Sequence, residues 1–190
     1  MADVSIKPIS RLLVANRGEI ARRIFRTAHE MGISTVAVYA DGDADAPFVH
    51  EADMAIALNG VTSAQTYLDT EKVLAACEAA GADAVHPGYG FLSENAAFAS
   101  AIIAKGITWV GPPIPAIEQM GDKLSAKAAM TEAKVPTLPA KELNAGDDVA
   151  AAAKEIGYPV LVKASAGGGG RGMRVVESEE GLKAAVEGAR

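Results

Sequence analysis

The feature of the sequence that most constrains the fold is a run of four consecutive glycines, residues 167–170, in the segment KASAGGGGRGM (163–173). Glycine loses more backbone entropy on ordering than any other residue, so such a run weakens a fold unless the backbone must approach a ligand closely. Consecutive backbone N–H groups can wrap a polyphosphate in this way. Apolar, β-branched residues on both sides, at 160–162 and 174–176, predict two strands. The sequence therefore predicts a β-hairpin whose glycine loop covers phosphate groups.

The two commonest glycine-rich nucleotide motifs do not fit this chain. A Walker loop needs Gly-Lys-Ser/Thr followed at once by a helix, whereas Gly172 is followed by Met173 and a predicted strand. A dinucleotide-binding loop needs three spaced glycines after the first strand, and the segment after residues 11–15 has only Gly18. A disordered linker is the other alternative, but such linkers are usually rich in serine and are not bounded by two apolar strands.

Lys163 directly follows the first of these strands and is a second indication of an anion. An ammonium group beside apolar side chains is unfavourable unless an anion or a carbonyl group compensates it, and a phosphate would do so. The alternative is an ordinary lysine that extends its charged end into solvent. We expect ATP as the nucleotide, bound by Lys163, Gly167, Gly168, Gly169, Gly170, Arg171, Gly172 and Met173.

Composition narrows the class of protein. A chain of 190 residues can form one large core, or one domain and part of another. The net charge of −6 and an aromatic content of 5% disfavour nucleic acid as a partner. No apolar run approaches the roughly 20 residues of a membrane span, and the N-terminus has no signal-peptide core. The single cysteine, Cys77, fits a reducing compartment, so we expect a cytoplasmic protein with no membrane or nucleic-acid partner.

Strand and helix patterns alternate along the first half of the chain. Strands are predicted at 11–15, 34–40, 54–58, 82–86 and 107–110, and helices at 18–31, 47–52, 70–80 and 93–105. Gly32 and Gly81 are placed to end helices, and Ser93 to begin one. This alternation predicts an α/β fold with a Rossmann-like, doubly wound parallel sheet.

The sequence predicts three parts. The first domain covers residues 1–111, because the glycine and two prolines at 111–113 cannot continue a strand or a helix. A helical linker covers 112–135. Residues 136–190 form a subdomain with a helix at 148–156, the glycine hairpin and a helix that Ser178 begins and that continues to the last residue. Two strands and two helices are too few for an independent domain, so this subdomain looks truncated.

Five segments, in this order, resemble biotin carboxylase, the ATP-grasp component of acetyl-CoA, propionyl-CoA, methylcrotonyl-CoA, pyruvate and urea carboxylases. They are LLVANRGEIARRIFRTA (12–28), AVHPGYGFLSENAAFA (84–99), WVGPP (109–113), MGDKLSAK (120–127) and IGYPVLVKASAGGGGRGMRVV (156–176). The resemblance covers nearly the whole chain in register. It implies that the last part, 136–190, is a partial ATP-grasp subdomain and that the chain is the N-terminal portion of a longer enzyme.

The resemblance also implies roles for particular residues. Lys123 and Lys163 would contact ATP, and the glycine loop would fold over its phosphates. Tyr89 would line the side of the site that takes biotin and bicarbonate; a tyrosine that merely fills a turn is the alternative. Arg23, Arg26 and Glu30 would lie on the surface of a homodimer, or alternatively on a solvated helix face.

The implied reaction has two steps, in which bicarbonate and MgATP form carboxyphosphate and the carboxyl group then passes to N1′ of biotin. Biotin would be held on a biotin carboxyl carrier domain, and a separate carboxyltransferase would use the product. The resemblance places the acidic Mg²⁺ ligands and the residues that activate biotin beyond Arg190. No catalytic residue and no metal ligand is therefore expected in this chain, which should be inactive alone.

Alternatives remain open from the sequence. Another ATP-grasp ligase, such as one half of a carbamoyl-phosphate synthetase, would share the first domain type and the hairpin. A natural short protein that serves as a non-catalytic binding or assembly module is the second. His86 invites a metal or catalytic role, but His29 and His50 lie at no zinc-like spacing from it, so we expect His86 to be a hydrogen-bonded residue that holds a turn.

Overall fold

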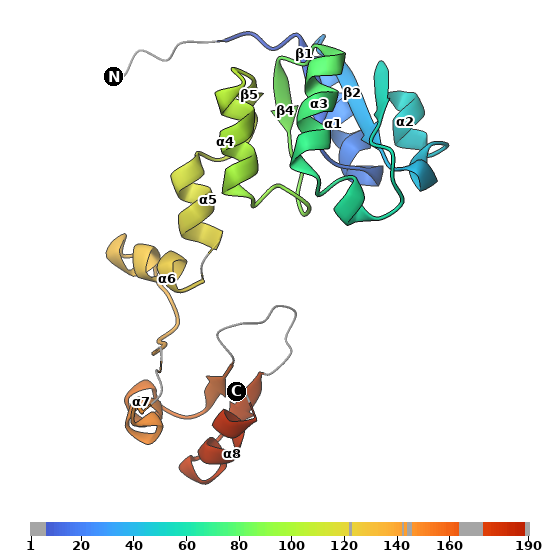
Figure 1. Cartoon of the computed structure of the whole chain (residues 1–190). Helices are drawn as coiled ribbons and strands as arrows, with labels where there is room; N and C mark the ends of the chain where they lie inside the picture. The colour runs from blue at the N-terminus through green and yellow to red at the C-terminus, as the bar shows by residue number, and fades with distance from the viewer. Residues whose placement is uncertain (1–6, 122, 142, 144–145, 164–172, 189–190) are drawn as a thin grey trace. The chain divides into compact units, whose positions relative to one another are not determined.

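The computed structural model of the chain describes residues 7–121, 123–141, 143, 146–163 and 173–188 (Figure 1). The chain divides into two compact units, Met1–Ala129 and Met130–Arg190. This division falls inside the predicted linker at 112–135, and the three-part domain boundaries stay a prediction. In the part of the chain that the structure describes, no helix is long and apolar enough to cross a membrane.

The first unit contains a parallel sheet of five strands in the order β3-β2-β1-β4-β5. The strands are β1 (Arg11–Val14), β2 (Ser34–Tyr39), β3 (Met54–Ala57), β4 (Ala84–His86) and β5 (Thr108–Trp109). Every neighbouring pair is parallel; Val14, for example, pairs with Ala37 of β2 and His86 of β4. The predicted α/β fold with a doubly wound sheet is confirmed, although several strands are one or two residues shorter than predicted.

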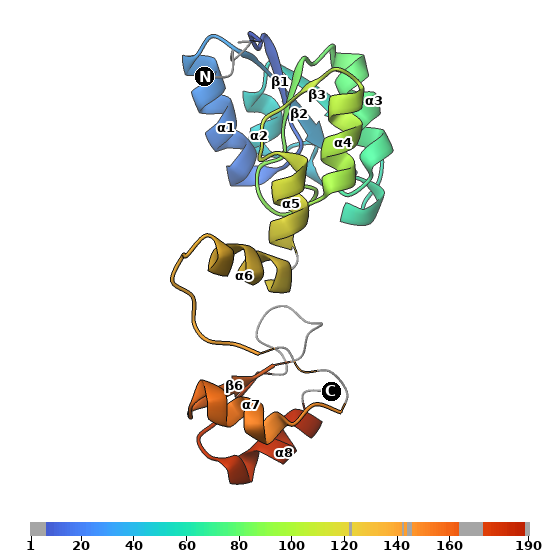
Figure 2. The ribbon, with the colours of Figure 1, turned by 90° about the vertical axis from the view of Figure 1, so that its left-hand side faces the viewer.

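Helices cover both faces of this sheet, as Figure 2 shows. The first pair is α1 (Gly18–Glu30) and α2 (Pro47–Glu51), and the second is α3 (Thr70–Ala80) and α4 (Ala96–Ala104). Side chains alternate along a strand, so Leu12 and Val14 pack with α1 and α2 in one buried cluster, whereas Leu13 packs with α3 and α4 in the other. Because the central strands are buried on both faces, they consist almost entirely of apolar residues.

The helix boundaries correct three predictions. Helix α4 does not begin at Ser93: Asn95 is its N-cap and accepts a hydrogen bond from Phe98 N (2.9 Å), while Ser93 N donates to Gly90 O in the preceding turn. Ser178 makes no capping hydrogen bond either. A 3₁₀ turn, Glu179–Gly181, follows it, and the regular helix begins only at Leu182. This helix ends at Glu187, where Gly188 is the C-cap, so the prediction that it continues to the last residue is also wrong, since glycine is a poor residue for an α-helix.

The structure agrees with the predicted end of α3 and with the predicted helical linker. Gly81 ends α3 in the left-handed conformation (φ 60°), as a glycine at this position commonly does. The predicted linker contains two helices, α5 (Ile114–Gly121) and α6 (Lys123–Glu132).

The second unit contains the predicted hairpin. Strands β6 (Val160–Val162) and β7 (Arg174–Val176) are antiparallel, with Val160 opposite Val176 and Leu161 opposite Val175. Helices α7 (Val149–Ile156) and α8 (Leu182–Glu187) pack with these strands. The buried cluster of this unit is small: it consists of Ala153, Val160, Val176, Leu182 and Ala185, with partly buried neighbours.

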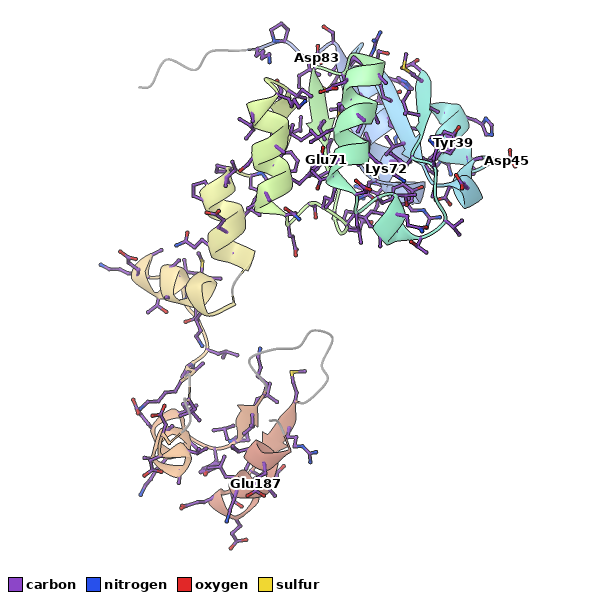
Figure 3. All side chains as sticks on the ribbon, viewed as in Figure 1. Tyr39, Asp45, Glu71, Lys72, Asp83 and Glu187 are labelled. Carbon is purple, nitrogen blue, oxygen red and sulfur yellow. The ribbon has the colours of Figure 1, made fainter. Side chains whose placement is uncertain are left out.

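Polar contacts fix the amino ends of the strands. Asp83, labelled in Figure 3, accepts hydrogen bonds from the backbone N–H groups of Ser10 (2.9 Å) and Arg11 (3.0 Å).

A second such contact joins β2 to the residue before β3. The fully buried Thr35 donates to Asp53 through its backbone N–H (2.7 Å) and its hydroxyl (3.0 Å), and His29 Nε2 lies 3.0 Å from the same carboxylate oxygen. The hydrogen bond from the Thr35 backbone, aided by those from His29 and the Thr35 hydroxyl, holds the pKa of Asp53 below its ordinary value and outweighs partial burial.

We expect Asp53→Ala to lower the free energy of unfolding by about 1 to 3 kcal/mol, because it removes the acceptor of the Thr35 backbone N–H group and one of the two acceptors near the Thr35 hydroxyl, the other being His29 Nε2. A carboxyl group whose pKa is lowered by folding stabilises the protein above its unfolded-state pKa, near 3.8, and this contribution is lost as the pH falls through the folded-state value. The difference between wild type and variant should therefore shrink as the pH falls below about 3.8.

Urea unfolding followed by the fluorescence of Trp109, the single tryptophan and a residue of the first unit, measures both effects. Asp45→Ala is the control, since Asp45 is exposed and points into solvent in Figure 3. Equal losses for the two variants, or a difference independent of pH, would contradict the role of Asp53.

Candidate functional site at the carboxyl edge and the hairpin

The carboxyl edge of the sheet is the first candidate site. From β1 the chain continues to β2 and β3 on one side, and β4 and β5 lie on the other, so the strand order reverses between β1 and β4. Open α/β sheets bind ligands beyond the carboxyl ends of their strands at such a point.

Asn16 occupies this point with its own side chain. The residue follows β1 and is fully buried. Its Nδ2 donates to Pro87 O and Tyr89 O, both at 2.9 Å, and its Oδ1 accepts from Arg17 N, also at 2.9 Å. One amide thus joins the end of β1 to the loop that follows β4.

A second polar cluster lies beside it. Arg17 donates from Nε to Asp43 Oδ2 (2.8 Å), and its Nη2 forms an ion pair with Oδ1. The Tyr67 hydroxyl donates to the same carboxylate and accepts from Ala40 N (3.0 Å). Burial would raise the pKa of Asp43, but the hydrogen bonds from Arg17 and Tyr67 outweigh it and lower this pKa. Burial, and then the hydrogen bond to Asp43, raise the pKa of Tyr67 above its ordinary value of 10.0.

The loop between Pro87 and Phe91 is held from both ends. Gly88 N donates to Nδ1 of His86 (2.9 Å), and burial lowers the pKa of this imidazole, which favours the neutral form that can accept. This confirms the expectation that His86 holds a turn through a hydrogen bond. At the other end the ring of Phe91 stacks on Tyr67, with centroids 5.0 Å apart and an interplanar angle of 18°.

Tyr89 lies in the middle of this loop with 60% of its surface exposed. Its hydroxyl group donates to Glu19 Oε2 at 3.2 Å. The ring therefore does not fill the turn, which was the alternative to a binding role. Its expected place on the biotin and bicarbonate side stays a prediction.

A cleft of about 490 Å³ lies beside Tyr89 along α1. Arg23 and Arg26 line it together with apolar residues of α1 and β1. Both arginines and Glu30 are exposed, and Arg23 pairs only loosely with Glu19 (3.6 Å). Their expected role at a dimer surface stays a prediction.

The hairpin of the second unit is the second candidate site. Its two faces differ: Val160 and Val176 are buried on one face, whereas Leu161 and Val175, which lie opposite each other, are 54% and 69% exposed on the other. Lys163 is exposed two residues after Leu161, so alternation places both on the exposed face. Met173 next to β7 is 46% exposed. An apolar platform with an ammonium group at its end matches a flat heterocycle that carries a phosphate chain.

Other predicted nucleotide contacts fall outside what the structure describes. Gly167, Gly168, Gly169, Gly170, Arg171 and Gly172 lie outside the described residues, and Lys123 begins α6 without a described side chain. Among the residues that are described, no group of three or more His, Cys, Asp or Glu could hold a metal ion.

Family models match the two candidate sites separately. Residues 8–117 match the model described as "Biotin carboxylase, N-terminal domain". The chain belongs to the biotin carboxylase family. Residues 122–190 match the "Carbamoyl-phosphate synthase L chain, ATP binding domain", the ATP-grasp module that contains the hairpin.

Relatives and solved structures agree with this family. The biotin carboxylase of Haemophilus influenzae is 49% identical over 94% of this chain and 40% of its own length. The propionyl-CoA carboxylase alpha chain of Ruegeria pomeroyi is 49% identical over 92% of this chain and 26% of its own length. The crystal structure of the Campylobacter jejuni biotin carboxylase, as a βγ-ATP complex, has 46% identity and a TM-score of 0.84 over 96% of this chain and 41% of that one. This member of the biotin carboxylase family therefore spans less than half the length of these relatives.

Sequence reasoning missed several residues of these sites. Asn16 and Tyr67 were not singled out, although an asparagine directly after an apolar strand is a signal for a buried amide. The bare face formed by Leu161 and Val175 follows from strand alternation once the buried face is known.

We expect Tyr67→Phe to lower the free energy of unfolding by about 1 to 3 kcal/mol, because it leaves the buried Ala40 N without its acceptor and removes one of the hydrogen bonds to Asp43, which keeps those from Arg17. Folding raises the pKa of Tyr67, so its contribution is present below pH 10.0 and is lost as the pH rises above that value. Urea unfolding at pH 7 and pH 10.5 measures this. Tyr39→Phe, at a half-buried tyrosine of β2, is the matched control, and an equal loss there would contradict a special role for Tyr67.

Proposed function

We propose that the chain supplies the N-terminal domain and part of the ATP-binding subdomain of a biotin carboxylase, an ATP-dependent ligase that carboxylates carrier-bound biotin. The observation that carries the proposal is the hairpin with its bare apolar face and Lys163, joined in one chain to a domain of the biotin carboxylase type. The relative from Hydrogenobacter thermophilus, 46% identical with a TM-score of 0.82, is described as a biotin carboxylase domain dimer in complex with MgADP and bicarbonate.

The hairpin holds the nucleotide in this proposal. The adenine packs on Leu161 and Val175, whose exposure to water is unfavourable until a ligand or another part of the enzyme covers them. The ammonium group of Lys163 then meets the phosphates, together with Lys123 and the glycine loop. Mg²⁺, when bound with ATP, neutralises phosphate charge during transfer. The family resemblance places its ligands in the remaining part of the enzyme, and among the described residues no group of three or more His, Cys, Asp or Glu could hold a metal ion.

In this proposal the carboxyl edge of the first unit, where Tyr89 lies, binds biotin, which accepts the carboxyl group. A bicarbonate oxygen attacks the γ-phosphorus of ATP, ADP leaves, and the product is carboxyphosphate. Loss of phosphate then allows the carboxyl carbon to bond to N1′ of biotin, which gives up its proton. Tyr89 presents an exposed ring that can pack on the bicyclic biotin and a hydroxyl that can hydrogen-bond to it.

The partners follow from the same proposal. A biotin carboxyl carrier domain brings biotin, and a carboxyltransferase subunit uses carboxybiotin; relatives of this chain are subunits of biotin-dependent carboxylases. Arg23, Arg26 and Glu30 face a second copy in a homodimer, which their exposure permits. A cytoplasmic location stays a prediction from the sequence.

A carbamoyl-phosphate synthetase is the second candidate, because residues 122–190 match an ATP-binding domain named after that enzyme. The hairpin chemistry is common to both enzymes, whereas the first 117 residues favour biotin carboxylase. Biotin as acceptor, rather than ammonia, distinguishes the two in an assay.

We expect the 190-residue chain by itself to show no ATP cleavage that depends on both bicarbonate and biotin, because the family resemblance places the Mg²⁺ ligands and the residues that activate biotin in the remaining part of the enzyme. An enzyme completed with the remaining family residues should show it. The measurement is release of inorganic phosphate with and without free biotin. Turnover by the 190-residue chain would contradict the assignment of essential residues to the rest of the enzyme.

In the completed enzyme, we expect Lys163→Gln to lower kcat/KM for ATP by roughly thirtyfold to several hundredfold, since a charge-assisted phosphate contact contributes about 2 to 4 kcal/mol. The KM for biotin should hardly change. Lys183→Gln is the control: Lys183 is an exposed lysine of α8 in the same unit. If both variants were equally mild, Lys163 would not contact the phosphates.

A further inference from the structure

The loop that carries Tyr89 is restrained by groups that lie far from it in the sequence. Asn16 binds the carbonyl groups of Pro87 and Tyr89, which are 71 and 73 residues away. Tyr67 stacks on Phe91 at the end of the same loop. Between these anchors the Tyr89 side chain is exposed, and its hydroxyl group donates a hydrogen bond to Glu19.

The Asn16 contact requires an amide. Its NH₂ group has two hydrogens, and each is used by one of the two carbonyl groups on either side of Gly88. Its Oδ1 is used by Arg17 N, so the hydrogen-bonding capacity of the buried side chain is well matched to its surroundings. A carboxylate of the same shape would have no hydrogen to donate, and a hydroxyl group would have only one.

Gly88 is complementary to this amide. Its φ is +66°, and a Cβ atom there would lie 2.7 Å from Asn16 Nδ2 and 2.7 Å from Ile20 Cγ2. Gly90 in the same loop has a similar φ of +70°, but a Cβ there meets no atom within 4 Å. The close approach is therefore specific to Gly88, where Asn16 passes between the two carbonyl groups.

We propose that Asn16 is a positioning residue: its amide fixes the backbone on both sides of Gly88 and so sets where the Tyr89 ring meets biotin. The inference rests on the proposed function for the identity of the substrate. Asn16 itself is fully buried and touches no substrate, so it acts through the loop. A residue with only a structural role would lower stability without separating the kinetics of the two substrates.

The kinetic test uses the completed enzyme with free biotin. We expect Asn16→Ser, which keeps one donor, to raise the KM for biotin by about tenfold to a hundredfold, because small displacements of a substrate-positioning group have effects of this size. The KM for ATP should stay within about twofold, since the hairpin is untouched. Gly88→Ala disturbs the same contact from the other side and should give the same separation, with effects that are not additive in the double variant.

Two matched controls isolate the contact. Asn95 lies in the same connection between β4 and α4, where its side chain caps α4. Asn95→Ala should therefore lower stability and leave the KM for biotin unchanged. Gly90→Ala imposes the same backbone strain as Gly88→Ala without the close contact and should have the smaller effect on biotin. Parallel changes in the biotin and ATP parameters, or equal effects of Asn95→Ala and Asn16→Ser on biotin, would overturn the inference.

Hydrogen exchange on the 190-residue chain gives a readout that does not depend on activity. Asn16→Ser should speed exchange of the amides of Gly88 and Ser93, which hydrogen-bond within the loop, and leave the Phe98 amide in α4 protected. Unchanged exchange at Gly88 and Ser93 would overturn the inference. Absence of biotin-dependent turnover in the completed wild-type enzyme would instead overturn the proposed function, and the exchange result would still decide whether Asn16 holds the loop.

Discussion

The first unit depends on how the carboxyl edge of its parallel sheet is closed. Parallel strands end together, and the loops that leave them bring polar backbone groups to one place where no ladder can satisfy them. Asn16 satisfies three of these groups at the two central strands: it donates to two carbonyl groups of the loop after β4 and accepts from the N–H group of the next residue, Arg17. Arg17, Asp43 and Tyr67 extend the closure to the end of β2, and Tyr67 returns to the β4 loop through Phe91.

This closure explains why a Rossmann-like sheet lacks the nucleotide loop that its topology would allow. A buried amide occupies the point between β1 and β4, so a pyrophosphate would have to displace three hydrogen bonds that are already made. In the proposed function, nucleotide binding falls to the hairpin of the second unit, where an apolar face and Lys163 are exposed. The role proposed for the first unit is then to present the exposed ring of Tyr89.

Local patterns in the sequence predicted most of the fold. The alternation of strand and helix, the glycine that ends α3 and the hairpin around residues 164–172 all depend on residues close together in the chain, and the structure confirms the elements. The start of α4 does not follow from local pattern, because Ser93 and Asn95 are both good N-cap residues. The turn in which Ser93 N donates to Gly90 O leaves Asn95 as the N-cap. The contacts of Asn16 could not be predicted, because its partners are more than 70 residues away.

The same reasoning explains which site residues the sequence could indicate. Lys163 was recognisable because its charge follows an apolar strand, and Tyr89 because the motif around it resembles a family. Asn16 and Gly88 carry neither signal: an asparagine in a loop and a glycine in a turn are common, and each is informative only beside the other. A Cβ at Gly88 would overlap the Asn16 amide. The identity of each residue is therefore set by its partner, and their close contact restrains the backbone from which the side chain of Tyr89 extends.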